Sequence, residues 1–354
     1  MTALAAHLIR RIAATGPISV ADYMADCLLH PDHGYYATRD PFGAAGDFTT
    51  APEISQMFGE LVGLALAQGW LDQGSPAPFV LAEPGPGRGT LMADALRATR
   101  GVPGFHAAAR VVLVEASPTL RAIQRRTLGD HPVTWADTVE ALPEAPLFLI
   151  ANEFFDALPI RQFQRGPDGW HERVVGLKGG RLAFGLSAPL PLPDPRFAAD
   201  PPGTVTETCA PAAAIMAGIA ARIARHGGAA IVIDYGGWRS KGDTLQAVRA
   251  HAPEHPLANP GEADLTAHVD FEGLARATAL PHSGLTDQGL LLQRLGIDQR
   301  AARLAAGLRG PALQSHLAAH RRLTHPAEMG SVFKAIAFHA KGTPAPPGFD
   351  PTHA

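Results

Sequence analysis

The sequence predicts an α/β fold built on a largely parallel sheet, and two observations support this prediction. Short apolar runs alternate with helical patterns, as strands and helices of a parallel sheet do, and these runs lie near residues 79–83, 111–115, 133–136 and 147–151. The first run ends in an acid and a glycine-rich turn, directly before a helical pattern. Two later apolar runs, AAIVIDYG and VFKAIAFHA, supply further strands.

The glycine-rich turn belongs to the segment FVLAEPGPGRGT, which places Gly85, Gly87 and Gly89 at alternate positions behind Glu83. Glycine lets a ligand approach the backbone closely, and the N–H groups at the start of the following helix can bind it. A dinucleotide site needs G-x-G-x-x-G, but the position that would complete this spacing is Thr90. The pattern E-x-G-x-G-x-G instead resembles the first motif of class I methyltransferases, whose ligand is S-adenosylmethionine.

A second cofactor residue is expected at the end of the next strand. In doubly wound sheets a carboxylate roughly 20 residues beyond the glycines binds the ribose hydroxyls. The run VVLVE ends in Glu115, which we expect to take this role. Ser117 and Pro118 follow at once and predict an N-cap and a first helical turn.

Composition fits a globular enzyme and excludes other classes. The 354 residues suffice for one elaborated domain or about two simple ones, and 46% hydrophobic residues can fill a core. A net charge of −3 gives no basic footprint for nucleic acid, and no stretch is apolar enough for membrane insertion. Two cysteines, Cys27 and Cys209, favour a reduced, cytosol-like compartment. The amphipathic start, MTALAAHLIRRIAATG, weakly imitates a transit peptide, and we interpret it as a structural helix.

The chain divides by pattern into four parts. They are an N-terminal helical region over 1–75, a core over 76–156 and 225–342, a β-rich insertion over 157–224 and a flexible tail over 343–354. Within the first part an apolar stripe predicts a helix over 53–71, which Thr50 and Glu53 would begin as a capping box. The apolar face of that helix fits either the core or the surface of a homodimer.

The fourth apolar run carries the expected chemistry. LFLIANEFFDALP leaves Asn152, Glu153 and Asp156 at the carboxyl edge of the sheet, where ligands bind in open α/β folds. We interpret these three residues as catalytic. In an alternative interpretation Asn152 caps a helix, Phe154 and Phe155 are core, and the acids are solvated.

The chain as a whole resembles the MidA-like proteins, a family of class I methyltransferases. The segments that carry the resemblance are GPISVADYM, HPDHGYY, GDFTTAPEISQMFGEL, EPGPGRGTLMADALR, NEFFDALPIRQF, IDYG, GDTLQAV, ADLTAHVDF and RLTHPAEMG. The resemblance implies a Rossmann-like sheet with an N-terminal helical region and a β-rich insertion after the fourth strand, on the substrate side. It also implies methylation of protein arginine, on a target such as a respiratory complex I subunit. The compartment would be the cytoplasm of a bacterium, or the mitochondrial matrix of a eukaryote.

The family motifs fall on particular residues of this chain. The residues implied to bind the cofactor are Glu83, Gly85, Gly87, Gly89, Glu115, Asp137, Thr50 and Gln56. The N-terminal motif, which would form a lid or simply a capped helix, falls on Asp47, Thr49, Thr50, Pro52, Glu53, Ser55 and Gln56. The chain departs from the family pattern at Pro84, where leucine is usual, and at Gly237, where an aromatic residue or histidine is expected.

If the methyl group is transferred to an arginine side chain, roles can be suggested for the two acids Glu153 and Asp156. Its guanidinium stays charged and delocalised at neutral pH, so carboxylates against two of its nitrogens would orient it and polarise the third. We assign this role to Glu153 and Asp156. His268 and Asp270, alternating on an expected strand, would line the acceptor cleft or be structural.

Other interpretations stay open. His30 and His33 could imitate a metal pair, but the intervening proline favours a turn, and no metal is expected. A small-molecule O- or N-methyltransferase would use the same cofactor pocket with a closed acceptor cavity. A non-catalytic complex I assembly factor would need no donor binding. Incubation of a cell extract with labelled cofactor shows whether the label enters a protein or a small molecule. Calorimetry shows whether the chain binds the cofactor at all.

Overall fold

The computed structural model describes residues 1–38, 50–192 and 194–350. The expected lid residues Asp47 and Thr49 lie outside this part of the chain. The structure divides into two compact units, each assembled from separate stretches. The parallel-sheet unit comprises 49–155, 214–238 and 271–354, and the small-sheet unit comprises 1–48, 156–213 and 239–270.

These boundaries differ from those expected. Helix α5 (Gln56–Asp72), expected in the N-terminal region, belongs to the parallel-sheet unit. The insertion expected over 157–224 is divided between the units. Residues 157–213 belong to one unit with the first helices of the chain and with residues 239–270, which were expected in the core, whereas 214–224 belong to the parallel-sheet unit.

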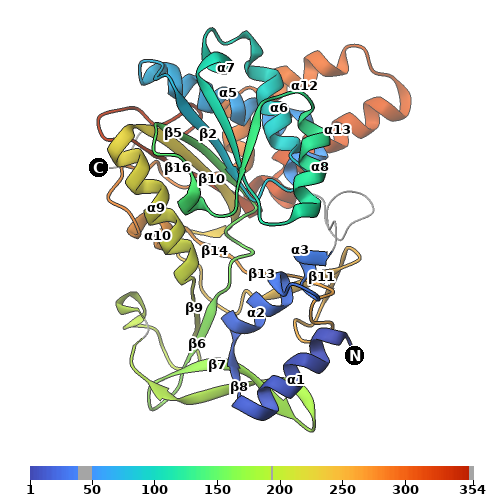
Figure 1. The fold of residues 1–354 in the computed structure, drawn as a ribbon, viewed down its shortest axis with the longest axis vertical. Helices are drawn as coiled ribbons and strands as arrows, with labels where there is room; N and C mark the ends of the chain where they lie inside the picture. The colour runs from blue at the N-terminus through green and yellow to red at the C-terminus, as the bar shows by residue number, and fades with distance from the viewer. Residues whose placement is uncertain (39–49, 193, 351–354) are drawn as a thin grey trace. The chain divides into compact units, whose positions relative to one another are not determined.

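The parallel-sheet unit is organised around strands in the order β15-β16-β10-β5-β2-β3-β4 (Figure 1). Strands β10, β5, β2, β3 and β4 are parallel, β16 is antiparallel to β10, and β15 is antiparallel to β16. Their bounds are β2 (Phe79–Pro84), β3 (Ala109–Val114), β4 (Val133–Ala136), β5 (Leu147–Asn152), β10 (Gly228–Gly237), β15 (Thr286–Asp287) and β16 (Phe333–His339). The parallel sheet expected from the apolar runs is confirmed.

The strand order reverses between β2 and β5. From β2 the chain continues to β3 and β4 on one side, and it later returns through β5 to β10 on the other side. Ligands of open α/β sheets bind beyond the carboxyl ends of the strands at such a reversal. Both β2 and β5 are buried along their whole length, which explains why their sequences read as continuous apolar runs rather than as alternating ones.

Helices cover the sheet on both sides. Figure 1 shows α9 on one side, and α6 and α8 on the other. The helices of this unit are α4 (Ala51–Ile54), α5, α6 (Thr90–Ala98), α7 (Phe105–Ala108), α8 (Pro118–Leu128), α9 (Ala210–His226), which begins in the small-sheet unit, α10 (Phe271–Arg276), α11 (Gln288–Arg294), α12 (Ile297–Ala305) and α13 (Gly310–Thr324). The apolar face of α5 is buried in the core, through residues Met57, Phe58, Leu61, Val62, Ala65, Leu66 and Trp70. This face is therefore core and not a dimer surface.

Two local expectations are wrong. The expected helix over 53–71 is interrupted, because Ser55 is extended and caps α5 by accepting from the Met57 N–H at 3.3 Å. Thr50 precedes α4 without a side-chain capping bond, so the capping box with Glu53 is not formed.

The flexible tail expected over 343–354 is also wrong as far as the chain is described. Pro346 is buried, and a Cβ placed on Gly69 of α5 would lie 3.8 Å from its side chain. Phe349 packs against the main hydrophobic core, and Asp350 pairs with Arg294 at 2.9 Å. Apolar residues at spaced positions therefore hold this segment onto the unit.

The small-sheet unit contains short strands and the first helices. Its elements are α1 (Ala3–Thr15), β1 (Ile18–Ser19), α2 (Val20–Leu29), α3 (Tyr35–Thr38), β6 (Arg161–Arg165), β7 (Trp170–Lys178), β8 (Arg181–Leu190), β9 (Val205–Thr208), β11 (Gln246–Arg249), β12 (Ala252–Glu254), β13 (Asp264–Thr266) and β14 (Val269–Asp270). One sheet has the order β1-β7-β6-β9 with β8 beside β7, and a second has the order β12-β11-β13. The β-rich character expected of the insertion is confirmed.

The remaining features of the chain are simple. His30 and His33 lie at a turn with their rings stacked 5.1 Å apart. Cys27 and Cys209 both carry free thiols. Within the described ranges, every helix is too short or too polar to traverse a lipid bilayer.

Candidate active site

The glycine loop leaves the carboxyl end of β2 in a tight left-handed path. The three glycines have φ of 60° at Gly85, 52° at Gly87 and 81° at Gly89, a region that residues with a Cβ rarely adopt. The Gly85 N–H donates to the Val114 carbonyl of β3 at 3.0 Å, and the Gly89 N–H donates to the Pro86 carbonyl at 2.7 Å. Bare backbone and the start of α6 are thereby presented at the point where the strand order reverses.

Glu83 lies directly beneath this loop. Its side chain is buried, and its Oε2 has no hydrogen-bond partner among the residues that the structure describes. Burial raises the pKa of Glu83 to about 8, although a hydrogen bond from the Met92 backbone opposes the shift. A buried acceptor atom left open beside bare backbone is a site that a polar or cationic group of a ligand would complete.

Glu115 follows β3 and is fixed from two sides. Its Oε1 accepts from the Ser117 N–H at 2.8 Å, and its Oε2 accepts from Gln124 Nε2 at 3.2 Å. Burial raises the pKa of Glu115, and these two hydrogen bonds oppose the shift. The expected N-cap is confirmed, since Ser117 accepts from the Leu120 N–H. The carboxylate is therefore anchored next to the glycine loop.

Asp137 lies after β4 and is largely exposed. Its carboxylate pairs with Arg121 Nη2 at 2.6 Å, and the same arginine donates through Nε to the Glu115 carbonyl oxygen. Arg121 thus connects the two acids that were expected to contact the ribose and the adenine.

Short helix α4 is fastened at both ends to the carboxyl edge of the sheet. Glu153 Oε1 accepts from the Ala51 N–H at 3.0 Å, at the start of α4. Glu53 accepts a hydrogen bond from the hydroxyl of Thr90, which begins α6. The contacts join the N-terminal motif to the turn after β5 and to the start of α6, and they were not foreseen. Thr50 is buried immediately before α4.

Gln56 has a different set of partners. It is exposed at the start of α5, and its amide donates to Glu60 Oε1 at 3.0 Å. Glu60 also accepts from Arg97 and Arg300, at 2.9 Å and 2.7 Å. The amide of Gln56 thus belongs to this ionic cluster.

The turn after β5 brings Asn152 and Glu153 together. Asn152 Nδ2 donates to Glu153 Oε1 at 3.0 Å, and Asn152 Oδ1 is buried with no hydrogen-bond partner in the described part of the chain. Glu153 has φ of 50°, an uncommon conformation for a residue other than glycine. Such strain is retained where surrounding contacts hold it, and it is frequent at functional sites.

Asp234 of β10 holds this turn in place, a role that the sequence did not reveal. Its Oδ2 accepts from the Phe154 and Phe155 N–H groups at 3.2 Å and 3.0 Å, and its Oδ1 accepts from Tyr235. Phe154 in turn lies against the loop, because a Cβ on Gly85 would be 2.8 Å from its ring. The IDYG segment carried the only sequence signal for this contact.

Asp156 belongs to the small-sheet unit. Its side chain is buried, and its carbonyl oxygen accepts from the Ala267 N–H at 3.0 Å. The expected strand around His268 is reduced to β14, and Asp270 pairs with Arg196 at 2.7 Å. Asp270 therefore has a structural partner.

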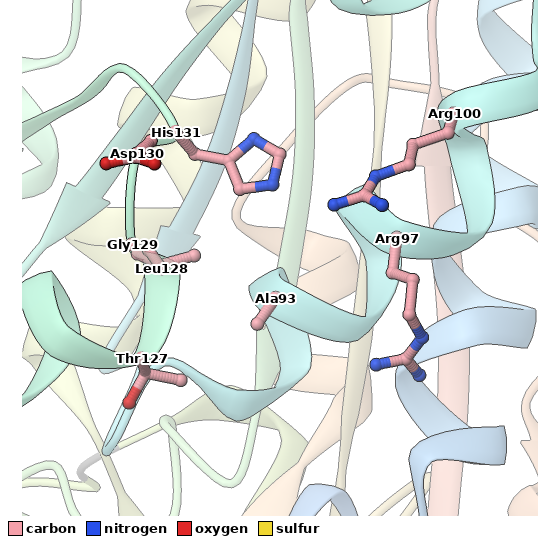
Figure 2. Close-up of a pocket in the computed structure, with 8 residues that line it drawn as sticks. All are labelled: Ala93, Arg97, Arg100, Thr127, Leu128, Gly129, Asp130 and His131. Carbon is pink, nitrogen blue, oxygen red and sulfur yellow. The ribbon is translucent and has the colours of Figure 1, made fainter.

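A surface pocket of about 450 Å³ lies at the opposite ends of the strands (Figure 2). Arg97 and Arg100, from the end of α6, line it together with the turn 127–131, which leads into β4. Figure 2 shows the Arg100 guanidinium and the His131 ring directed toward one another across this pocket. Because the glycine loop follows the carboxyl end of β2, this pocket is distinct from that loop.

The residues at the carboxyl edge fit S-adenosylmethionine. The open Oε2 of Glu83 can accept from a ligand ammonium group, the glycine loop admits a ligand to the backbone, and Glu115 can accept from ribose hydroxyls. Asp137 and the buried Thr50 remain predicted contacts.

Comparisons with known proteins agree with this fit. The family model "Putative S-adenosyl-L-methionine-dependent methyltransferase" matches residues 61–289. Protein arginine methyltransferase NDUFAF7, mitochondrial, of Xenopus laevis is 37% identical over 363 residues, 94% of this chain and 83% of that protein. The Homo sapiens protein of the same name is 36% identical over 368 residues, 95% of this chain and 83% of that protein.

A solved structure agrees as well. The crystal structure of a superfamily member from Burkholderia thailandensis bound to S-adenosyl-homocysteine has a TM-score of 0.82 and 33% identity, covering 95% of this chain and 92% of that chain. The expected methyltransferase sheet and cofactor class are thereby confirmed. This chain belongs to the family of S-adenosylmethionine-dependent methyltransferases that the matched model describes.

Proposed function

We propose that this methyltransferase modifies arginine in a protein substrate, such as a subunit of respiratory complex I. The observation that carries the proposal is the similarity to proteins named protein arginine methyltransferase, which extends over 94% of this chain or more in Xenopus laevis and Homo sapiens. The proposal places the enzyme in the cytoplasm of a bacterium, or in the mitochondrial matrix if the chain is eukaryotic.

We assign cofactor binding to the residues that the motifs indicate. Glu83, the three glycines and Glu115 form the central contacts, with Asp137 on the adenine side. Thr50 closes the site from the N-terminal segment, and Gln56 contributes only if its amide leaves Glu60. When bound, S-adenosylmethionine supplies a methyl group on a positively charged sulfur.

The acceptor half is assigned to the turn after β5. A guanidinium remains charged at neutral pH, so it must be oriented and its buried charge compensated. Glu153 suits this task because the Ala51 N–H and the Asn152 amide hold its carboxylate in one place. Asn152 offers an open Oδ1 as a further acceptor. Asp156 follows three positions later as the second expected carboxylate.

The proposal is tested by following a labelled methyl group. The purified chain is incubated with S-adenosylmethionine, labelled on its methyl group, and a cell extract, and the protein and small-molecule fractions are then separated. We expect label in protein, recovered as methylarginine after hydrolysis, and abolished by excess S-adenosylhomocysteine. Label in the small-molecule fraction would replace the proposal with a metabolite methyltransferase. Absence of cofactor binding by calorimetry would favour a non-catalytic assembly factor.

A further inference from the structure

A buried glutamine, Gln124, hydrogen-bonds both the glycine loop and Glu115. Gln124 lies in α8 and is fully buried. Its Nε2 donates to the Gly87 carbonyl oxygen at 2.8 Å and to Glu115 Oε2 at 3.2 Å. Because Gly87 lies in the glycine loop and Glu115 at the end of β3, one amide group connects both.

Trp135 determines which way this amide points. An indole N–H can only donate, and that of Trp135 donates to Gln124 Oε1 at 2.7 Å. The carbonyl end of the amide therefore faces Trp135, and its two N–H donors face the loop and the acid. A flipped amide would place a carbonyl oxygen against the Glu115 carboxylate. The Arg125 guanidinium lies 4.5 Å from the centre of the Trp135 ring and supports it.

Gln124 also packs against the third glycine of the motif. A Cβ on Gly89 would lie 3.4 Å from Gln124 Cγ and 3.6 Å from its Cα. Gln124 therefore meets the loop at two glycines, through a hydrogen bond to Gly87 and through close packing against Gly89. An added Cβ would make ordinary van der Waals contact with Gln124, and it is the φ of 81° that favours glycine at this position.

The arrangement leaves part of the Glu115 carboxylate available. A carboxylate has about four lone-pair directions. Ser117 occupies one on Oε1 and Gln124 one on Oε2. The Ala116 backbone also hydrogen-bonds the carboxylate, and the acceptor capacity that remains is fixed in space, which suits a ribose hydroxyl donor.

We propose that Gln124 is a positioning residue that holds the glycine loop and Glu115 at a fixed separation, and thereby sets the preference of the site for a ribose with a free 2′-hydroxyl. This inference rests on the proposed cofactor roles of those two elements. The removal of its amide leaves the half-buried Gly87 carbonyl and the half-buried Glu115 carboxylate each short of a donor, so the ribose contact should loosen more than the others.

The test is the affinity for two ligands, S-adenosylhomocysteine and its 2′-deoxyadenosyl analogue, measured by calorimetry. In Gln124→Leu we expect the Kd of S-adenosylhomocysteine to rise about tenfold, the equivalent of about 1.4 kcal/mol. The Kd of the deoxy analogue should rise much less, so that the ratio of the two values approaches one. Trp135→Phe keeps Gln124 but removes the donor that orients it, and should shift the ratio in the same direction by a smaller factor.

Gln288→Leu is the matched control. Gln288 is also fully buried in the parallel-sheet unit, and its Nε2 donates to the Leu323 carbonyl at 3.0 Å. This substitution should lower stability without changing the ligand ratio. If the Kd values of both ligands rise equally in Gln124→Leu, or neither rises, the positioning role is overturned. If Gln124→Leu does not fold, the two Kd values of Trp135→Phe decide by the same criterion. A wild-type chain that binds without ribose preference would overturn the proposed site as well.

Discussion

Two buried carboxylates on the strands that flank β5 show how differently one sheet uses its acids. Strands β2 and β10 both pair with β5, and each carries a buried acid, Glu83 and Asp234. Asp234 accepts backbone N–H bonds from Phe154, Phe155 and Tyr235. Glu83 has an Oε2 without a hydrogen-bond partner among the described residues. An acid whose oxygens accept from backbone donors holds the fold, whereas one with an open oxygen beside the glycine loop is available to a ligand.

The two loops above these acids make a second contrast. The chain turns through a positive φ at both Gly85 and Glu153. Glycine adopts this conformation without strain, whereas another residue pays roughly 1 kcal/mol or more for it. Under the proposed function, the side chain is absent where a ligand would approach the backbone, and the strained carboxylate is kept where a charge would be needed. Four predictions test this contrast, from the largest expected effect to the smallest.

The pH dependence of stability should report on Glu83. Its pKa is raised from 4.5 to about 8 in the folded chain, so between these values the folded state keeps a proton that the unfolded state has lost. Stability should therefore fall as pH rises through this window, by at most about 5 kcal/mol from this group. Urea unfolding at several pH values should show a shallower fall for Glu83→Gln. Plots of stability against pH that run parallel for the wild type and Glu83→Gln would contradict a raised pKa of Glu83.

Asp234→Asn should destabilise the fold at every pH. The amide that replaces one oxygen cannot accept from the backbone groups that now donate to it. Buried unsatisfied donors cost about 1–3 kcal/mol each, so we expect a loss of roughly 2–4 kcal/mol in urea unfolding. Glu83→Gln at pH 5 is the matched comparison, since Glu83 is then protonated, and it should cost much less. Equal losses would remove the distinction between the two acids.

Glu153→Gln should separate the role of the Glu153 charge from the role of its hydrogen bonds. The glutamine oxygen can still accept from the Ala51 and Asn152 donors, so stability and S-adenosylhomocysteine affinity should hardly change. Turnover should fall about a hundredfold, the equivalent of about 2.7 kcal/mol of transition-state stabilisation. Steady-state kinetics on the methylated substrate provide the measurement. Unchanged turnover with unchanged substrate binding would take Glu153 out of the reaction.

Gly85→Ala should weaken cofactor binding, because the added methyl group would come too close to Phe154. The added Cβ would lie 2.8 Å from the Phe154 ring, at a φ of 60°. Gly129 is a matched control, because its φ is 57° and a Cβ there would meet nothing within 4 Å. Both alanine variants should lose roughly 1 kcal/mol of stability from backbone strain. Only Gly85→Ala should raise the Kd of S-adenosylhomocysteine, by about tenfold; equal Kd values in the two variants would mean that the loop does not meet the ligand.

Much of the parallel-sheet unit could be predicted, because its signals are local. The buried strands are continuous apolar runs, and the three glycines and Glu115 follow directly from strand ends. The helix break at Ser55 could not be foreseen, since an apolar stripe runs on past it. Short strands such as β11 and β12 contain too few residues for a period to be recognised.

The contacts that organise the site are mostly long-range in sequence, and this limits what the sequence can predict. Glu153 meets Ala51 across 102 positions, and Phe155 meets Asp234 across 79. Composition gives no means of pairing such residues. Gln56 illustrates the converse, because its motif suggested a ligand contact while its amide is held by the charged Glu60.

The central claim is that the glycine loop and Glu115 together hold the adenosyl cofactor. A crystal structure with S-adenosylhomocysteine tests it most directly. We predict ribose hydroxyls within hydrogen-bonding distance of the Glu115 carboxylate, with the remainder of the ligand along the loop at Gly85 to Gly89. A ligand bound elsewhere, or a crevice that stays empty at saturating ligand, would contradict the account.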